Sequence, residues 1–400
     1  MLRGTGGEVP SVHAEVTPVD ARFRGDEHLR RVLEVASRIL REGRVKCLSG
    51  RPEDALVEEA LAMLGCRVPR CGEAPAECSL EELGFYEDVS PSTLRVFNST
   101  EELLYKNWPT PLVRLNSLGD GKVRAWAKLE FFNPFSMSVK DRIGWYMVKK
   151  LLEKHPGASL ALYEATSTNT GMALAAMGAI KGFRVKLFLP ETIQKASDTL
   201  LSVMGAEVRR VPKSLTVEFI DDVEHLAKEE GGVHLNQFEN DANFGVHLRY
   251  TAKELDLQVR SAKLNLRGIV GGLGTSGHLS ALSLYFKSRY SDVKIYGVQP
   301  APGTVIPGIR RVETGMKWVH YVSVDKVVDV TPEEAVAHAV KVARREGILV
   351  GLSSGAVTAA FEALYSGGEL PEGDYVLVYP DHGFKYVEQF SKYLPIIHQR

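Results

Sequence analysis

The chain has little net charge and no long apolar run, and each absence excludes a class of protein. Its 49 lysines and arginines nearly balance its 50 aspartates and glutamates, for a formal net charge of −1. This balance gives no sign of a nucleic-acid or anionic-membrane partner. No run approaches the roughly 18 consecutive apolar residues of a membrane span. The opening MLRGTGGEVPSVHAEV has no apolar core of signal-peptide length, so we expect a cytoplasmic protein.

Cysteine is also scarce, with four residues that all lie before residue 80: Cys47, Cys66, Cys71 and Cys78. Their spacing lacks the paired C-x-x-C elements of a zinc site and no histidine stands among them, so no metal is predicted. We expect buried free thiols. Disulfides are the alternative, chiefly for a hyperthermophilic source. Asn and Gln are also sparse, which is typical of thermophilic proteins.

The first hundred residues differ in pattern from the rest. Amphipathic helices are predicted over Ala21–Gly43 and Pro52–Gly65, the second with proline near its start and glycine at its stop. No catalytic constellation occurs there, so we expect this section to pack against the main body or across a subunit interface. At 400 residues, 44% hydrophobic and 25% charged, the whole chain has room for two or three domains.

From about residue 108 strands and helices alternate, which predicts an α/β fold with helices on both faces of a parallel sheet. Strands are expected at Val123–Phe132, Ser159–Ala165, Arg184–Pro190, Val233–Phe238, Val293–Pro300, Gly347–Gly355 and Asp374–Asp381. Helices are expected at Met172–Gly182, Glu191–Gly205, Val217–Glu230 and Ala242–Val259. One more helix opens at Thr331 with a capping box and a proline at its first position.

The most informative stretch is NPFSMSVKDRIG, residues 133–144, with Lys140 at its centre. It follows a predicted strand and precedes a helical pattern, and Ser138 and Asp141 have the spacing of a capping box. Lys140 is therefore expected in the first turn of a helix at the carboxyl end of a strand, where open α/β sheets bind ligands. A solvated lysine is the ordinary interpretation. The positive helix end disfavours its charged form, however, and a neutral amine is a nucleophile toward aldehydes.

Three further turns are suited to anions. Gly272-Leu273-Gly274-Thr275-Ser276-Gly277 follows a strand and opens a helix, an arrangement that cradles phosphate. It is neither a Walker loop nor a dinucleotide fingerprint, so a small phosphorylated cofactor fits better. Residues 166–171, TSTNTG, are expected as a loop that suits a carboxylate, and residues 353–355 make a third such turn. Taken singly, each is equally well explained as a tight turn or helix cap.

Together these segments resemble a known family. N-P-x-S-x-S-V-K-D-R, T-S-x-N-T-G, G-x-G-T-S-G and G-x-S-S-G-A occur in the order found in the cysteine synthase branch of the pyridoxal-phosphate β-family. The resemblance runs from about Pro109 to the carboxyl terminus. It implies fold type II, tryptophan synthase β-like, with two open, mostly parallel sheet domains plus a helical N-terminal section. The expected division is 1–100 as the extension, 101–132 with 246–400 as the large cofactor-binding domain, and 133–245 as the small substrate-closing domain. A homodimer is also implied.

The same resemblance implies roles for single residues. Lys140 would carry the internal Schiff base with pyridoxal 5'-phosphate and remove the α-proton of the substrate. Asn169 would bond the ring hydroxyl, and Ser353 would face the pyridine nitrogen and leave it unprotonated. The phosphate would be held by Gly272, Gly274, Thr275, Ser276 and Gly277. The substrate carboxylate would be held by Thr166, Ser167, Thr170 and Gln237.

The chain departs from common cysteine synthases in three ways. Thr168 stands where the family loop usually has glycine, which would narrow the carboxylate site, and the leading hundred residues are extra. The third departure is the segment Ala301–Gly315, which carries Arg310 and Arg311 and, with the long N-terminal section, resembles the archaeal O-phosphoserine sulfhydrylases. Paired arginines suit a phosphate dianion. Neighbouring side chains of an extended segment point opposite ways, so we expect Arg310 to face the site. A solvated or interface pair is the alternative.

The predicted function is cysteine synthesis by β-replacement, from O-phosphoserine and sulfide to cysteine and phosphate through an aminoacrylate on pyridoxal phosphate. The nearest alternatives are an O-acetylserine sulfhydrylase or a cystathionine β-synthase, although no carboxy-terminal regulatory module is expected. A hydroxyamino-acid dehydratase or threonine synthase fits the T-S-x-N-T-G motif less well. A non-catalytic amino-acid sensor on the same fold is the alternative from another class, and the intact Lys140 argues against it.

Overall fold

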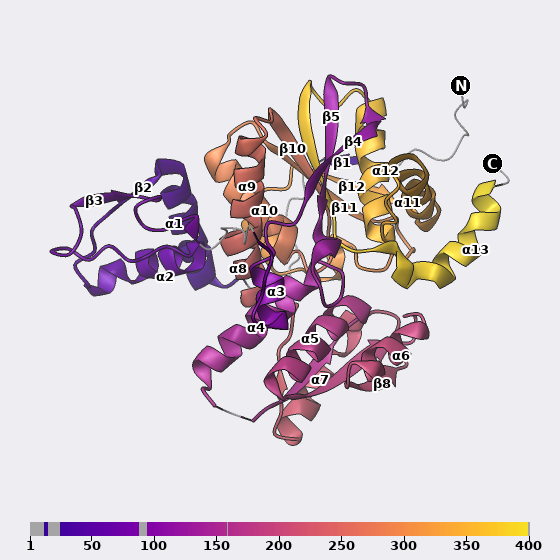
Figure 1. Ribbon diagram of the computed structural model, residues 1–400, viewed down its shortest axis with the longest axis horizontal. Coiled ribbons are helices and arrows are strands. Elements are labelled where there is room, and N and C mark those ends of the chain that lie inside the picture. The colour runs from indigo at the N-terminus through magenta and orange to yellow at the C-terminus, as the bar shows by residue number, and fades with distance from the viewer. Residues whose placement is uncertain (1–11, 15–24, 88–93, 158, 399–400) are drawn as a thin grey trace.

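The computed structural model describes residues 12–14, 25–87, 94–157 and 159–398. They build two large β-sheets with helices on their faces and one two-stranded sheet (Figure 1). The larger sheet has the strand order β1-β12-β11-β10-β13-β5-β4, with β1 and β4 antiparallel at its edges and parallel pairing between. Its strands are β1 (Val12–Ala14), β4 (Leu112–Gly119), β5 (Val123–Leu129), β10 (Leu266–Gly272), β11 (Lys294–Pro300), β12 (Lys326–Val330) and β13 (Gly373–Tyr379).

The smaller sheet is parallel throughout, in the order β8-β7-β6-β9. Its strands are β6 (Ala161–Ala165), β7 (Arg184–Pro190), β8 (Glu207–Val211) and β9 (Val233–His234). The predicted α/β fold with two open, mostly parallel sheets is confirmed. The division of the chain into domains at residues 132/133 and 245/246 stays a prediction.

Helices cover both faces of the larger sheet because its central strands are apolar on both sides. Along β13, Tyr375, Leu377 and Tyr379 belong to the core beneath α11 (Pro332–Glu346) and α12 (Leu352–Ser366). Val376 and Val378 between them point into the core of α9 (Ala252–Ser261) and α10 (Gly277–Arg289). This alternation is the period-two geometry of a strand. The described helices contain no segment both long and apolar enough to cross a membrane.

The remaining elements are nine helices and seven short turns of the described residues. The helices are α1 (Glu27–Glu42), α2 (Ala55–Leu64), α3 (Thr100–Tyr105), α4 (Lys140–Lys154), α5 (Thr168–Lys181), α6 (Ala196–Val203), α7 (Ile220–Glu229), α8 (Ala242–Val246) and α13 (Val387–His398). The short turns are η1 (Pro52–Asp54), η3 (Glu130–Phe132), η4 (Thr216–Phe219), the π-helical η5 (His247–Thr251), η6 (Val312–Thr314), η7 (Trp318–Tyr321) and η8 (Gly383–Tyr386). Of these elements, η5, η7 and α8 pack against α10 of the larger sheet.

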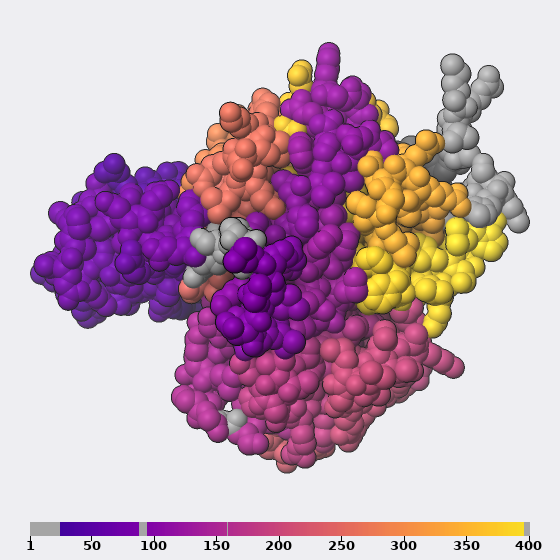
Figure 2. Space-filling view, in the orientation of Figure 1, coloured from indigo at the N-terminus to yellow at the C-terminus, as the bar shows by residue number. Residues whose placement is uncertain are grey.

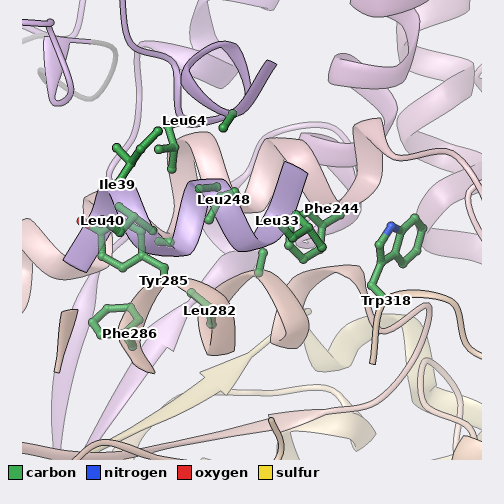
Figure 3. Close-up of a cluster of buried hydrophobic side chains, with 14 of the residues drawn as sticks. Leu33, Ile39, Leu40, Leu64, Phe244, Leu248, Leu282, Tyr285, Phe286 and Trp318 are labelled. Carbon is green, nitrogen blue, oxygen red and sulfur yellow. The ribbon is translucent and has the colours of Figure 1, made fainter. Parts of the chain in front are cut away.

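The N-terminal section forms a lobe beside the main body (Figure 2). It holds α1, α2 and the hairpin of β2 (Arg44–Lys46) with β3 (Glu77–Ser79). Leu33 and Leu40 of α1 lie in one apolar core with Leu248 of η5 and with Leu282 and Tyr285 of α10 (Figure 3). The predicted helical section is therefore confirmed, and it packs against the main body. Its first helix begins at Glu27, and residues 21–24 of the predicted range lie outside the described residues.

The cysteine prediction is half wrong. Cys47 and Cys71 form a disulfide, while Cys66 and Cys78 are buried free thiols as expected. The backbone brings the first pair together because Leu48 bridges Arg70, so the neighbouring cysteines lie with Cα atoms 4.9 Å apart. Sequence spacing carries no such information. Among the described residues no three His, Cys, Asp or Glu side chains are grouped to hold a metal ion.

Several predicted elements are corrected. Gly347–Gly355 is not a strand: only Val350 makes an isolated bridge, to His382, and α12 then begins at Leu352. A short apolar run such as this one fits a strand and a buried helix equally well. The strand β12 was also not predicted from the sequence. The strand at 233–238 ends at His234, because Asn236 adopts a left-handed φ of 52°. The helix at 242–259 is interrupted by the π turn η5, and the helix at 191–205 starts only at Ala196.

Candidate active site

Lys140 is the first residue of α4, just beyond the carboxyl end of β5, as the sequence predicts. The predicted capping box is wrong. The Ser138 hydroxyl accepts from the Lys140 amide at 3.1 Å, but Asp141 accepts from the amides of Phe135 at 2.7 Å and Ser136 at 2.9 Å. The loop folds back over the helix start, with Met137 at φ 50°, and this brings those earlier amides to Asp141. The loop before Lys140 is therefore fixed from inside the helix.

The Lys140 amine is set up to lose its proton. Burial lowers its pKa to about 8, and the nearby Lys385 ammonium acts in the same direction, whereas Asp381 opposes the shift. The described residues offer this amine no hydrogen bond or ion pair. At neutral pH Lys140 therefore has a larger neutral fraction than an ordinary lysine, which suits a nucleophile toward an aldehyde.

The glycine-rich turn joins β10 to α10 and is closed in by its neighbours. A Cβ on Gly274 would lie 2.6 Å from the Gly308 carbonyl oxygen, and one on Gly277 would lie 2.5 Å from Asn243 Oδ1. Ser276, at φ 72°, caps α10 without a side-chain hydrogen bond to the helix amides. The first amides of a helix have no partner within it, so this turn offers free N–H donors to an anion. The fit to a phosphate group is good.

The TSTNTG segment is not a loop throughout, because α5 already begins at Thr168 and places Asn169 and Thr170 in its first turn. The Asn169 side-chain N–H donates to Asp381 Oδ2 at 2.8 Å. The Thr170 hydroxyl donates to Gln237 Oε1 at 2.7 Å, so two residues predicted for the carboxylate lie in contact. Thr168 instead bonds the Ser197 hydroxyl of α6 at 2.6 Å. Thr168 also lines a cavity beside Ser167, and its effect on the carboxylate site stays a prediction.

One cavity brings together predicted residues from distant parts of the chain, namely Lys140, Ser167, Gln237, Gly274, Thr275 and Arg310. A second cavity shares Ser167 and Gly308 with it and is lined by Asn169. The remaining predicted residues lie outside both linings: Thr166, Thr170, Gly272, Ser276, Gly277, Ser353 and Arg311. Ser353 is buried in the first turn of α12, and a Cβ on Gly308 would lie 3.7 Å from its hydroxyl. The roles of all these residues toward ligands stay predictions.

The two neighbouring arginines face different ways. Arg310 lines the cavity and donates from Nε to the Gly274 carbonyl at 2.8 Å, with its guanidinium 5.1 Å from the Phe238 ring centroid. Arg311 is absent from that lining and pairs with Asp329 at 3.0 Å and with Glu313. This geometry favours Arg310 and disfavours Arg311 as a substrate contact.

Sequence reasoning missed several residues of the site. Asp381, Lys385 and Tyr386 follow β13, and their side chains meet around Asn169. Thr192 and Ile193 line both cavities from the loop after β7. A weak signal was present, since Asp381 is a polar residue at the carboxyl end of a predicted strand.

Comparison with known proteins agrees with this geometry. The family model described as "Pyridoxal-phosphate dependent enzyme" matches residues 103–381. Cysteine synthase B of Salmonella typhimurium is 36% identical over 285 residues, covering 70% of this chain and 91% of that protein. Cystathionine beta-synthase of Saccharomyces cerevisiae is 34% identical over 310 residues, covering 70% of this chain and 61% of the yeast protein. The crystal structure of O-ureido-L-serine synthase matches with a TM-score of 0.65 at 26% identity, covering 74% of this chain and 96% of that one.

The described residues fit the cofactor that this family uses. A buried amine of lowered pKa suits an aldehyde, and a helix start with close-approach glycines suits a phosphate. Residues 1–102 lie outside the family match, in keeping with an extra N-terminal section. The chain belongs to the pyridoxal-phosphate-dependent enzymes, as a relative of the cysteine synthases and cystathionine β-synthases.

Proposed function

We propose that the protein makes cysteine from O-phosphoserine and sulfide with release of phosphate. Pyridoxal phosphate, when bound, supplies the electron sink that lets an amino acid lose its α-proton and its β-substituent. Lys140 would take the α-proton, and its lowered pKa makes it a competent base near neutral pH. Thr170 and Gln237, already in contact, would orient the carboxylate together with Thr166 and Ser167.

The environment of Arg310 is the observation that favours O-phosphoserine over O-acetylserine as the substrate. Its partners are all uncharged: the carbonyls of Gly274 and Gly315, the hydroxyl and carbonyl of Thr314, and the Phe238 ring. Within the described chain no carboxylate forms an ion pair with it, and Glu239 acts on it only through space. Arg311, one residue on, has two carboxylate partners.

The Arg310 side chain is half-buried. A partly desolvated cation without a counter-ion is unfavourable, so an anionic ligand would be stabilised there. Burial lowers the pKa of the Arg310 guanidinium to about 10, which still leaves it protonated at neutral pH. A phosphate dianion on the substrate would complete the pairing, whereas a neutral acetyl ester would not. The interaction raises the rate only so far as it strengthens when negative charge develops on the leaving group.

The test compares two substrates in two variants. Cysteine formation is measured with sulfide and either O-phosphoserine or O-acetylserine, in the wild type and in Arg310→Ala. Loss of one charge-assisted contact of about 1.5–3 kcal/mol predicts a 10- to 100-fold fall in kcat/KM for O-phosphoserine. For O-acetylserine the change should stay within about threefold, because no ionic contact is lost.

The adjacent Arg311→Ala is the matched control, since it removes the same charge from the same loop. It should alter both substrates alike and leave their ratio unchanged. If Arg310→Ala also leaves the ratio unchanged, the phosphate assignment is wrong and the O-acetylserine reaction is favoured. No turnover with either substrate would instead favour a cystathionine β-synthase reaction or a non-catalytic sensor.

A homodimer and a thermophilic source belong to this proposal as well. Light scattering during gel filtration should give about twice the chain mass of 44.1 kDa. A peak at the single-chain mass would contradict the dimer without affecting the substrate assignment.

A further inference from the structure

A buried polar cluster surrounds Asn169 on the side of β13. It contains Asp381, Lys385 and Tyr386, the last two from η8. Lys385 is 3% exposed and lies beyond residue 381, where the family match ends. A lysine so deeply buried needs partners for its charge, and here those partners are parts of the active site.

Each hydrogen bond of this cluster has a defined donor and acceptor: Lys385 only donates, and Asp381 only accepts. The Lys385 ammonium donates to the Ser136 carbonyl at 2.6 Å and to Asn169 Oδ1, and it lies 3.9 Å from Asp381 Oδ2. The Asn169 amide nitrogen donates to Asp381 Oδ2 at 2.8 Å. The Tyr386 hydroxyl donates to the same carboxylate oxygen.

This pattern leaves the Asn169 carboxamide one orientation. An ammonium has three donors and no acceptor, and an ionised carboxylate has acceptors only. A reversed carboxamide would face its NH₂ toward the Lys385 ammonium and its oxygen toward the Asp381 carboxylate, two repulsive contacts in place of two charge-assisted bonds. The Asn169 side chain donates to Asp381, interacts with the Tyr386 hydroxyl as well, and lines the second cavity.

We propose that Lys385 is a positioning residue that, together with Asp381, locks the carboxamide of Asn169 with its N–H toward the cofactor. The acceptor would be the ring hydroxyl oxygen of pyridoxal phosphate. Lys385 also holds the carbonyl of Ser136, in the loop that leads to Lys140, so one ammonium ties both cofactor contacts together. The inference rests on the proposed role of Asn169 and is independent of the phosphoserine substrate.

The test is a double-mutant cycle read by cofactor affinity. The dissociation constant of pyridoxal phosphate from the full-length protein is measured by fluorescence for the wild type, Lys385→Met, Asn169→Ala and the double variant. Freeing the carboxamide to flip should weaken binding about tenfold in Lys385→Met, the value of one lost hydrogen bond. In the Asn169→Ala background the same change should cost less than about twofold, because coupled residues are not additive.

Further variants separate positioning from general damage. Lys385→Arg keeps an obligate donor and should recover part of the affinity, and it serves if Lys385→Met does not fold. Lys392→Met removes an exposed lysine of α13 and should leave the affinity unchanged. An equal loss from Lys385→Met in both backgrounds overturns the inference and keeps the role of Asn169. Unchanged affinity in Asn169→Ala overturns both.

Discussion

Arg142 and Lys140 lie two residues apart in the first turn of α4, yet their charges meet opposite surroundings. Arg142 bonds Glu130 at 2.6 Å and Glu254 at 2.5 Å, and Lys128 reaches Glu254 at 2.6 Å, all of them fully buried. The Arg142 guanidinium also lies 4.3 Å from the Trp108 ring centroid. Lys140, and Arg310 across the cavity, have no such carboxylate partners among the described residues.

The difference separates charged side chains that stabilise the fold through buried ion pairs from side chains that are available to a ligand. Two cations and two carboxylates compensate one another in the first cluster, so nothing there is left to bind a substrate. Breaking such a buried pair is costly because the partner is left uncompensated. In the second group Arg310 has no carboxylate ion-pair partner among the described residues, which favours binding of an anion, and Lys140 has none either, so burial lowers the pKa of its amine. The predictions below test this division, from the largest expected effect to the smallest.

Lys140→Ala should abolish cysteine synthesis and leave the fold intact. Removing the residue that we propose as the base predicts a loss of at least about 10²–10⁴ in kcat. Because Lys140 makes no ion pair with the part of the chain that the structure describes, the thermal unfolding midpoint should not fall. Activity assay and calorimetry check the two halves, and a large drop in the midpoint would contradict the division.

Arg142→Met should have the opposite effect and lower the free energy of unfolding. It leaves Glu130 and Glu254 buried without their partner, which predicts a loss of about 3–5 kcal/mol in the free energy of unfolding. Urea unfolding of the purified variant measures this. Adding Glu254→Gln to Arg142→Met should recover part of the loss, and a loss under about 1 kcal/mol would show that the cluster is not structural.

The disulfide of the N-terminal lobe lies outside both the Arg142 cluster and the cavity, so its removal tests whether stability and activity can be changed separately. Cys47 and Cys71 are 24 residues apart in sequence, and a loop of this size predicts about 3 kcal/mol of stabilisation for a single closure. Cys47→Ser should therefore ease unfolding of the lobe while the ratio of kcat/KM for the two substrates stays constant. Limited proteolysis followed by mass spectrometry locates the opened segment, and cleavage spread evenly over the chain would speak against a local effect.

The pH dependence of stability should also distinguish the two groups. Burial alone would raise the pKa of Glu130, but Arg142 and Lys128 outweigh it and lower the pKa to about 2. The stability from Glu130 is then present above its ordinary pKa of 4.5 and is lost as the pH falls toward 2.

Lys140 should behave in the reverse sense. Its pKa falls from 10.5 to about 8 on folding, so the unfolded chain binds more protons between these values and stability should rise with pH across that window. Unfolding curves of Glu130→Gln and Lys140→Met should lose the acid and alkaline slopes respectively. A variant that keeps its slope would identify another group as the source.

Much of the site was predictable because it depends on local order. The strand before Lys140 and the helix after it follow from apolar periodicity, and the turn at Gly272–Gly277 follows from glycines between a strand and a helix. The helix at Thr331 opens with the expected capping box, and Gly182 and Gly347 end α5 and α11 in left-handed conformation.

What failed depends on contacts between distant segments. The order of strands in a sheet cannot be predicted from the local sequence pattern. Asp381 and Lys385 reach Asn169 because β13 lies between β10 and β5, next to the strand that leads to Lys140. The same cause explains two further errors, the strand predicted at Gly347–Gly355 and the Cys47–Cys71 disulfide that was not predicted. Burial and pairing depend on residues that are distant in sequence, which a local pattern does not identify.

The sequence alone determined the alternation of strands and helices, the lysine at a helix start and the glycine-rich turn before α10, because each depends on residues within a few positions of one another. Only the tertiary structure decided which of two adjacent arginines faces the cavity. Arg311 finds Asp329 on β12 while Arg310 finds carbonyls and an aromatic ring, and charge pairing is a property of distances in space.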